Sequence, residues 1–60
     1  MNSTHGTYEG TAVYADGDRA GFTVFANDAK EAQQLIAQKA VQHKPSVSML
    51  YVESVYRRQE

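Results

Sequence analysis

The 60-residue sequence contains no cysteine, no tryptophan and only one proline. Without cysteine the chain has neither a disulfide framework nor a thiolate ligand for a metal, and two isolated histidines cannot complete the usual structural zinc set. No apolar run approaches the length that crosses a bilayer, and residues 1–6 lack the apolar core of a signal peptide. These absences predict a cytoplasmic protein with no cofactor, no metal and no membrane partner.

A surplus of one charge is also missing, because six basic residues stand against seven acidic ones and the net charge is −1. Such a chain has no broad positive field to attract nucleic-acid phosphates. The one local basic cluster is Arg57 and Arg58, near the C-terminus. Two interpretations of Arg57 stay open: a solvated side chain, or a contact with a partner.

The strongest pattern in the chain predicts a helix that begins after Asp28 and ends near His43. Asp28 is a favourable N-cap, and Glu31 follows at the spacing of a capping box. Pro45 lacks an N–H and disfavours helical angles at Lys44, so the helix stops before it. The helical period places one stripe of residues toward a sheet: Ala29, Ala32, Ile36, Ala40 and His43.

Two segments before this helix, residues 7–14 and 21–25, are rich in aromatic and β-branched residues and predict strands. Asp16-Gly17 between them is typical of a tight hairpin turn, so the strands should be antiparallel neighbours. The loop length stays open. A two- or four-residue loop turns Thr11 and Val13 to the face of Phe22 and Val24. A three-residue loop with a bulge turns another set to that face: Tyr8, Ala12 and Tyr14.

The segment 46–56 predicts a third strand with apolar side chains on both faces. Strand alternation groups Met49, Tyr51 and Val55 on one face. The other face receives Leu50, Val52 and Tyr56. One helix covers only one face of a small sheet, so the uncovered face presents aromatic or aliphatic groups to its surroundings.

These elements predict a single α+β domain of ββαβ order over residues 7–58, after a flexible N-terminal tail of residues 1–6. We expect a three-stranded, antiparallel-rich sheet in the order 2-1-3, with the helix packed on one face. The last strand then lies at an edge. One expectation is a homodimer in which two last strands pair about a twofold axis near Tyr51 or Tyr56. The other is a monomer that keeps this edge for a foreign partner.

No constellation in the sequence predicts catalysis, so we expect a protein that is not an enzyme. Asp16 and Asp18 resemble the opening of a calcium loop, but no glutamate follows at the required interval, and a hairpin turn is the better interpretation. The four tyrosines, joined by Phe25 and helped by arginine, suit a protein interface, or else the stacking of RNA or single-stranded DNA bases on an open sheet face. Core packing is the third interpretation. The near-neutral charge favours protein contacts over nucleic acid.

A protein interface of this kind would draw on the tyrosines and on the other apolar and basic residues that the pattern leaves uncovered. Val41 belongs to it because it points away from the helical stripe, although a singly exposed valine is also ordinary. The full set of interface candidates is Tyr8, Tyr14, Val41, Met49, Tyr51, Tyr56 and Arg57.

Residues 22–32, FTVFANDAKEA, resemble the strand-to-capped-helix junction of small ββαβ domains. Such domains include the archaeal ribosomal LX-type domain and assorted phage-encoded accessory proteins. The ribosomal family is strongly basic and this chain is not, so ribosomal RNA binding is not implied. The resemblance implies a small accessory protein that works by docking, in the manner of phage inhibitors of host defence.

Overall fold

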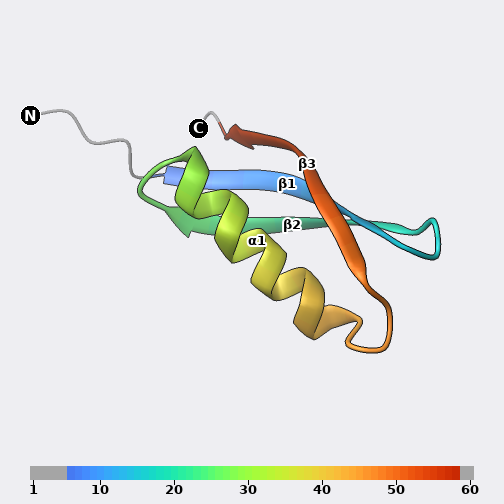
Figure 1. Cartoon of the computed structure of the whole chain (residues 1–60). Coiled ribbons are helices and arrows are strands. Elements are labelled where there is room, and N and C mark those ends of the chain that lie inside the picture. The colour runs from blue at the N-terminus through green and yellow to red at the C-terminus, as the bar shows by residue number, and fades with distance from the viewer. Residues whose placement is uncertain (1–5, 59–60) are drawn as a thin grey trace, which may run out of the picture.

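A computed structural model describes residues 6–58, in which one helix packs against an antiparallel sheet (Figure 1). In chain order the elements are β1 (Gly6–Tyr14), β2 (Arg19–Ala26), α1 (Ala29–His43) and β3 (Met49–Arg57). The sheet order is β2-β1-β3, and β1 is antiparallel to both neighbours. The predicted ββαβ fold and its strand order are therefore confirmed. The predicted tail lies outside the described residues, except for Gly6, where β1 begins.

Both ends of α1 lie where the sequence predicts them. Glu31 N donates to Asp28 Oδ1 over 2.8 Å, and Asn27 N donates to Glu31 Oε1 over 2.7 Å. The second hydrogen bond reaches one residue further back than in the usual capping box, whose glutamate accepts from the N-cap N–H. At the other end, Lys44 N donates to Ala40 O over 3.2 Å. Local hydrogen bonds therefore close the helix at both termini.

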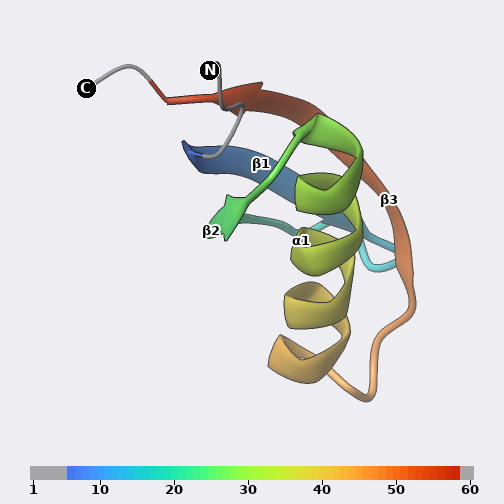
Figure 2. The same cartoon turned by 90° about the vertical axis from the view of Figure 1, so that its left-hand side faces the viewer.

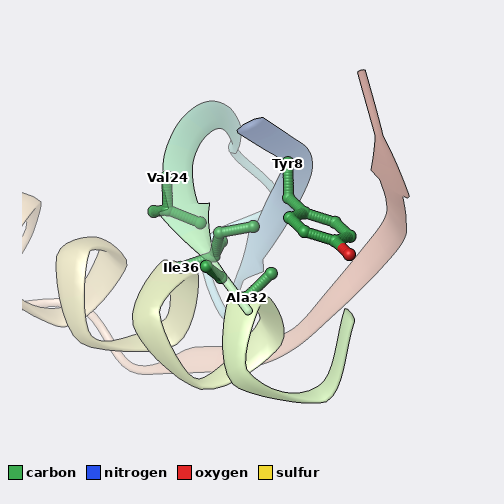
Figure 3. Packing of buried hydrophobic residues seen from close by; sticks show 5 residues of the cluster. Tyr8, Val24, Ala32 and Ile36 are labelled. Atoms are coloured by element: carbon green, nitrogen blue, oxygen red, sulfur yellow. The ribbon is translucent and has the colours of Figure 1, made fainter. Parts of the chain in front are cut away.

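One side of α1, from Ala32 to its last turn, supplies its contact with the sheet. Ala32, Ile36 and Ala40 are fully buried, and Figure 3 shows Ile36 and Ala32 beside Val24 and Tyr8. The prediction for Ala29, at the start of the stripe, was wrong, because that residue is exposed. His43, at the other end, is also exposed, but its ring meets Phe22 of β2 edge-on with the ring centres 5.6 Å apart, so it does face the sheet.

Gly10 on β1 lies against Ile36 of α1 with no room for a side chain of its own. A Cβ placed on it would lie 2.8 Å from Ile36 Cδ1 and 3.1 Å from Val55 Cγ2. Real Cβ atoms essentially never come within 3.0 Å of another atom, so the absence of a side chain at Gly10 makes room for Ile36. The small residues of α1 and this glycine together allow the helix to lie directly on the sheet.

The β1–β2 hairpin settles the loop length that the sequence leaves open. Tyr14 N donates to Asp18 O over 2.9 Å and Gly17 N donates to Tyr14 O over 3.0 Å, which closes a loop of residues 15–17. Gly17 has φ +92° and supplies the bulge conformation that such a loop needs. The register pairs Gly10 with Phe22, so even-numbered residues of β1 face α1. The three-residue alternative is therefore the one observed, and its predicted set is buried: Tyr8, Ala12 and Tyr14.

Replacement of Gly17 by Val should lower the free energy of unfolding by about 1–2 kcal/mol, because an L side chain is strained at positive φ and a β-branched one more so. Gly17→Asn is the matched control, since asparagine tolerates this region and should lose less. Urea unfolding followed by circular dichroism measures both. Equal midpoints for wild type and Gly17→Val would mean that the turn adopts another conformation in solution.

Two bulges in β3 explain why its sequence alternates poorly. The register shifts once between the partners of Glu9 and Thr11 and again between those of Val13 and Tyr14. Each shift leaves an additional residue in β3, and Ser54, at the first shift, has φ 60°. Each additional residue reverses the alternation of the side chains that follow it.

The bulges correct the predicted assignment of β3 side chains to faces. Residues three apart now turn to the same side, and Met49, Val52 and Val55 all pack partly buried against the core. The predictions that Tyr51 shares a face with Met49 and Val55, and Val52 with Tyr56, were wrong. Tyr51 and Tyr56 lie opposite Val13 and Glu9, whose side chains face away from α1.

Candidate functional site

The face of the sheet that α1 does not cover is the candidate site, and we call it the open face. Figures 1 and 2 show α1 on one side of the sheet, with no described element on the other. The strand register identifies the residues that point to the open face. They are Thr7, Glu9, Thr11 and Val13 on β1, Arg19, Gly21, Thr23 and Phe25 on β2, and Tyr51, Glu53 and Tyr56 on β3.

Two ion pairs cross the open face. Arg19 Nε lies 3.2 Å from Glu53 Oε2, so this pair spans the sheet from β2 to β3. Arg58 Nε, just beyond β3, lies 3.2 Å from Glu9 Oε2. Exposed pairs of this kind contribute no more than about 1 kcal/mol each to stability. Their consequence is electrostatic, since each arginine is neutralised by a neighbouring carboxylate.

Tyr56 joins the second of these pairs. Its hydroxyl donates to Glu9 Oε1 over 2.7 Å. This hydrogen bond to a carboxylate, and the negative charge of Glu9, raise the pKa of Tyr56 above its usual value of 10.0. The ring is thereby held across the sheet with its hydroxyl oriented, while 54% of the residue stays exposed.

Large apolar side chains lie exposed on the same face and beside it. Phe25 is 67% exposed and Tyr51 is 52% exposed, and Leu50 next to Tyr51 is 59% exposed. The two tyrosines lie on β3 and Phe25 lies on β2, so the apolar groups flank the charged residues rather than forming one continuous patch. Aromatic residues and arginine are both enriched at protein contact surfaces.

The structure separates the interface candidates that the sequence predicts. Tyr8 and Tyr14 are 5% and 1% exposed and belong to the core, and Met49 packs half-buried against the second core cluster. Val41 is 53% exposed but lies on α1, away from the sheet. The open face keeps only two of the candidates, Tyr51 and Tyr56.

Arg57, the remaining candidate, is exposed at the end of β3, where a Cβ on Gly6 would lie 2.6 Å from its Nε. It stands opposite Tyr8 in the register, and Tyr8 points to the covered face of the sheet. Sequence reasoning missed other members of the open face, namely Arg19, Glu53 and Glu9. The alternation of β1 and β2 is the signal that would have found most of them, once the three-residue loop is chosen.

A shallow hollow of about 190 Å³ lies on the open face. It opens over Gly21, where a Cβ would meet no atom within 4 Å. Its lining is Glu9, Gly10, Thr11, Gly21, Phe22, Thr23 and Tyr56. Within residues 6–58 no cluster of three or more histidine, aspartate or glutamate side chains could hold a metal ion.

The two carboxylates that resemble a calcium loop bind a lysine instead. Lys44 Nζ lies 2.7 Å from Asp18 Oδ2 and 3.0 Å from Asp16 Oδ2, so residues just after α1 and in the hairpin loop are tied together. The same ammonium lies 4.9 Å from the centre of the Tyr14 ring. Asp16 Oδ1 also accepts a hydrogen bond from Asp18 N over 3.0 Å. This cluster has a structural role at the loop end of the hairpin.

Acid should weaken the ion pair between Asp16 of the hairpin loop and Lys44. The Asp18 N–H, and next Lys44, lower the pKa of Asp16 from its usual 3.8. A carboxyl whose pKa is depressed on folding stabilises the fold above its unfolded value and loses that contribution as the pH falls through the folded value. We therefore expect the free energy of unfolding to fall below about pH 4.

Urea unfolding of wild type and Asp16→Asn at neutral and acidic pH checks this expectation. Asp16→Asn should have a lower free energy of unfolding than wild type at neutral pH. The difference between the two free energies should become smaller in acid. At high pH it is Lys44 that titrates. Hydrogen bonds to Asp18 and Asp16 raise the pKa of Lys44 from 10.5, so its contribution to stability is lost only when the pH rises through that raised value and the ammonium deprotonates. An unchanged gap across the acid range would show that Asp16 does not titrate differently on folding.

Comparison of the chain with protein-family models, curated proteins and solved structures finds no match. The resemblance of residues 22–32 to ribosomal and phage-encoded domains therefore stays a prediction. In the described part of the chain, no helix has both the length and the apolar character to span a membrane.

Proposed function

We propose that this protein is a small non-enzymatic binding module whose open face docks on another protein. The observation that carries the proposal is the pairing of exposed aromatic rings with charges that are already neutralised. Tyr51 and Tyr56 are more than half exposed, and the arginines beside them contact glutamates. Tyrosine is enriched among the residues that dominate binding energy at protein interfaces, because it offers a large, rigid and amphipathic surface.

The ion pairs favour a protein partner over nucleic acid. A phosphate that approached Arg19 would have to displace Glu53, and one that approached Arg58 would meet Glu9. Nucleic-acid affinity depends on cations that neutralise phosphates, so arginines held by carboxylates contribute little to it. The partner that fits is a protein surface of low net charge, with apolar groups to cover the tyrosines. Inhibition of a host system by a phage-type protein is the form of this activity that the sequence resemblance suggests.

Affinity capture from the cells in which the protein occurs tests the proposal. Wild type is compared with the double variant Tyr51→Ser, Tyr56→Ser, and Val41→Ser serves as the matched control because Val41 is similarly exposed on α1. We expect one protein to be captured by wild type and by Val41→Ser but lost with the tyrosine variant. The proposal fails if the tyrosine variant captures that protein equally well.

A fluorescence titration with labelled single-stranded RNA and DNA tests the alternative function. Binding that depends on Tyr51 and Tyr56 and weakens steeply between about 50 and 200 mM salt would identify a nucleic-acid-binding face and contradict the protein-docking proposal. We expect no such binding. Circular dichroism of each variant confirms that losses do not come from unfolding.

A further inference from the structure

The sheet has two edge strands, and they differ in regularity. β3 carries two register shifts and a residue at positive φ. β2 pairs with β1 through eight successive residue pairs without a shift. Bulges twist an edge away from further pairing, whereas a regular edge is a template for another strand. Of the two described edges, β2 is therefore the one suited to strand addition.

The hairpin hydrogen bonds show which backbone groups of β2 point outward. Tyr14 and Asp18 form a hydrogen-bonded pair, since Tyr14 N donates to Asp18 O. Hydrogen-bonded pairs alternate along an antiparallel ladder, so Gly10 and Phe22, two steps of alternation further on, form another. The odd-numbered residues of β2 alternate with these hydrogen-bonded pairs and direct N–H and C=O away from β1. Gly21 and Thr23 thus present backbone donors and acceptors to the outer edge.

On its open face, this edge carries a projecting side chain, Phe25, and a hollow over Gly21. Phe25 is 67% exposed on the open face, and Gly21 lies four residues before it on the same strand and face. Gly21 opens the hollow of about 190 Å³ described above. A cavity of about 150 Å³ is sufficient to hold benzene. The hollow is therefore large enough for the ring of a phenylalanine.

Thr23 lies midway between Gly21 and Phe25 in β2, so the edge is complementary to a second copy of itself. If two β2 strands pair antiparallel about a twofold axis at Thr23, Gly21 of each copy stands directly opposite Phe25 of the other. Directly opposed residues have side chains about 5 Å apart, within reach of an aromatic ring. An aromatic ring laid across a glycine is a known way to stabilise an edge glycine.

We propose that the chain forms a homodimer through the outer edge of β2, with the Phe25 ring of each copy seated over Gly21 of the other. A twofold interface requires a surface that complements itself. This edge does so, because the contact between Phe25 of one copy and Gly21 of the other occurs twice, once on each side of the axis. The three strands of each copy join one continuous sheet, with both helices on one face and both open faces on the other. The proposed function does not depend on this dimer, because Tyr51 and Tyr56 lie on the far strand.

A groove on the covered face runs along the same edge and supports the choice of a second copy. Its volume is about 410 Å³, and it lies between β2 and α1. Its lining is Thr23, Val24, Phe25, Leu35, Gln38, Lys39 and Gln42. A second β2 strand, with its own helix above it, covers this groove as well as the hollow over Gly21. Both faces of the edge therefore gain contacts from one pairing.

Sedimentation velocity and native mass spectrometry across a concentration series test the dimer with three variants. Phe25→Ala removes the projection. Gly21→Val fills the hollow, and its Cβ meets no atom within 4 Å in the single chain, so the variant should fold at least as well as wild type. Tyr51→Ala is the matched control, because it truncates an exposed aromatic residue on the open face of β3.

We expect a two-chain mass for wild type at micromolar concentration and an unchanged dissociation constant for Tyr51→Ala. Phe25→Ala and Gly21→Val should each raise the dimer dissociation constant at least about tenfold, as truncation of a central interface residue does. Any of three results overturns the proposal: a one-chain mass for wild type up to high micromolar concentration, a dimer indifferent to both β2 variants, or a dimer lost in Tyr51→Ala. The last result would support pairing through β3.

Discussion

Tyr14→Ala is expected to lower the free energy of unfolding by about 3–5 kcal/mol, which is the usual cost of truncating a buried aromatic residue. Tyr14 is 1% exposed and packs in one cluster with Ala12 and Ala40. Its hydroxyl donates to Ala40 O over 2.8 Å, so the ring also supplies a cap for the last turn of α1. Domains are stable by only about 5–15 kcal/mol, with small ones at the lower end. Circular dichroism should show a much lower unfolding midpoint and a partly unfolded protein at room temperature.

Tyr14→Phe separates the two contributions of this side chain. Phenylalanine keeps the packing and removes the hydrogen bond, and a typical hydrogen bond contributes about 0.5–1.5 kcal/mol. Ala40 O still accepts from Lys44 N in the variant, since that bond is in the backbone. Urea unfolding should therefore place Tyr14→Phe close to wild type and far from Tyr14→Ala. If both variants match wild type, Tyr14 is not part of the core in solution.

Ile36→Ala should cost about 2–5 kcal/mol, because it opens a cavity where the helix meets the sheet. Ile36 is fully buried between Ala32, Tyr8 and Val24 (Figure 3). Asp28→Ala, which removes the N-cap hydrogen bond, should cost only about 1 kcal/mol and serves as the reference for a local helix defect. Urea midpoints rank the two variants. A neutral Ile36→Ala would contradict the sheet-facing direction of α1.

Gly10 offers a sharper test of the same contact. Gly10→Ala alone should be destabilising, because the new Cβ would lie 2.8 Å from Ile36 Cδ1. Ile36→Val removes that methyl group and makes room. In a double-mutant cycle the combined variant should therefore lose less stability than the sum of the two single changes. Additive losses would mean that Gly10 and Ile36 do not touch in solution.

The helix and the hairpin could be predicted because their signals are local in the sequence, and the strand order follows from the usual hand of the crossover. Asp28, Glu31 and Pro45 mark the ends of α1 within a few residues of each end, and Asp16-Gly17 marks the hairpin. The loop length could not be chosen, since the two alternatives differ by one residue and bury opposite faces of β1. Packing decides between them: the observed register buries Tyr8 and Tyr14, which have far more apolar area than Thr11 and Val13.

The open face was less predictable than the fold. Its position depends on the register of β1 and on two bulges in β3. Ser54 has φ 60°, but no glycine or asparagine stands there to signal positive φ. The contact of Lys44 with Asp16 and Asp18 joins residues 26 to 28 positions apart, and charge alone does not reveal such a pairing. Tyr51 and Tyr56 could be proposed from composition, but their place on one face required the structure.

The strand order affects the rate at which the chain folds. β1 is the first strand in the chain and the centre of the sheet, and its second edge is completed only by β3, the last element. The β1–β2 hairpin can form within microseconds as a local event. Pairing of β1 with β3 closes a loop that contains both β2 and α1, and contacts between distant segments slow folding because chain entropy is lost before they form. Docking of β3 should therefore limit the folding rate, and the half-formed sheet that precedes it exposes two regular strand edges at once.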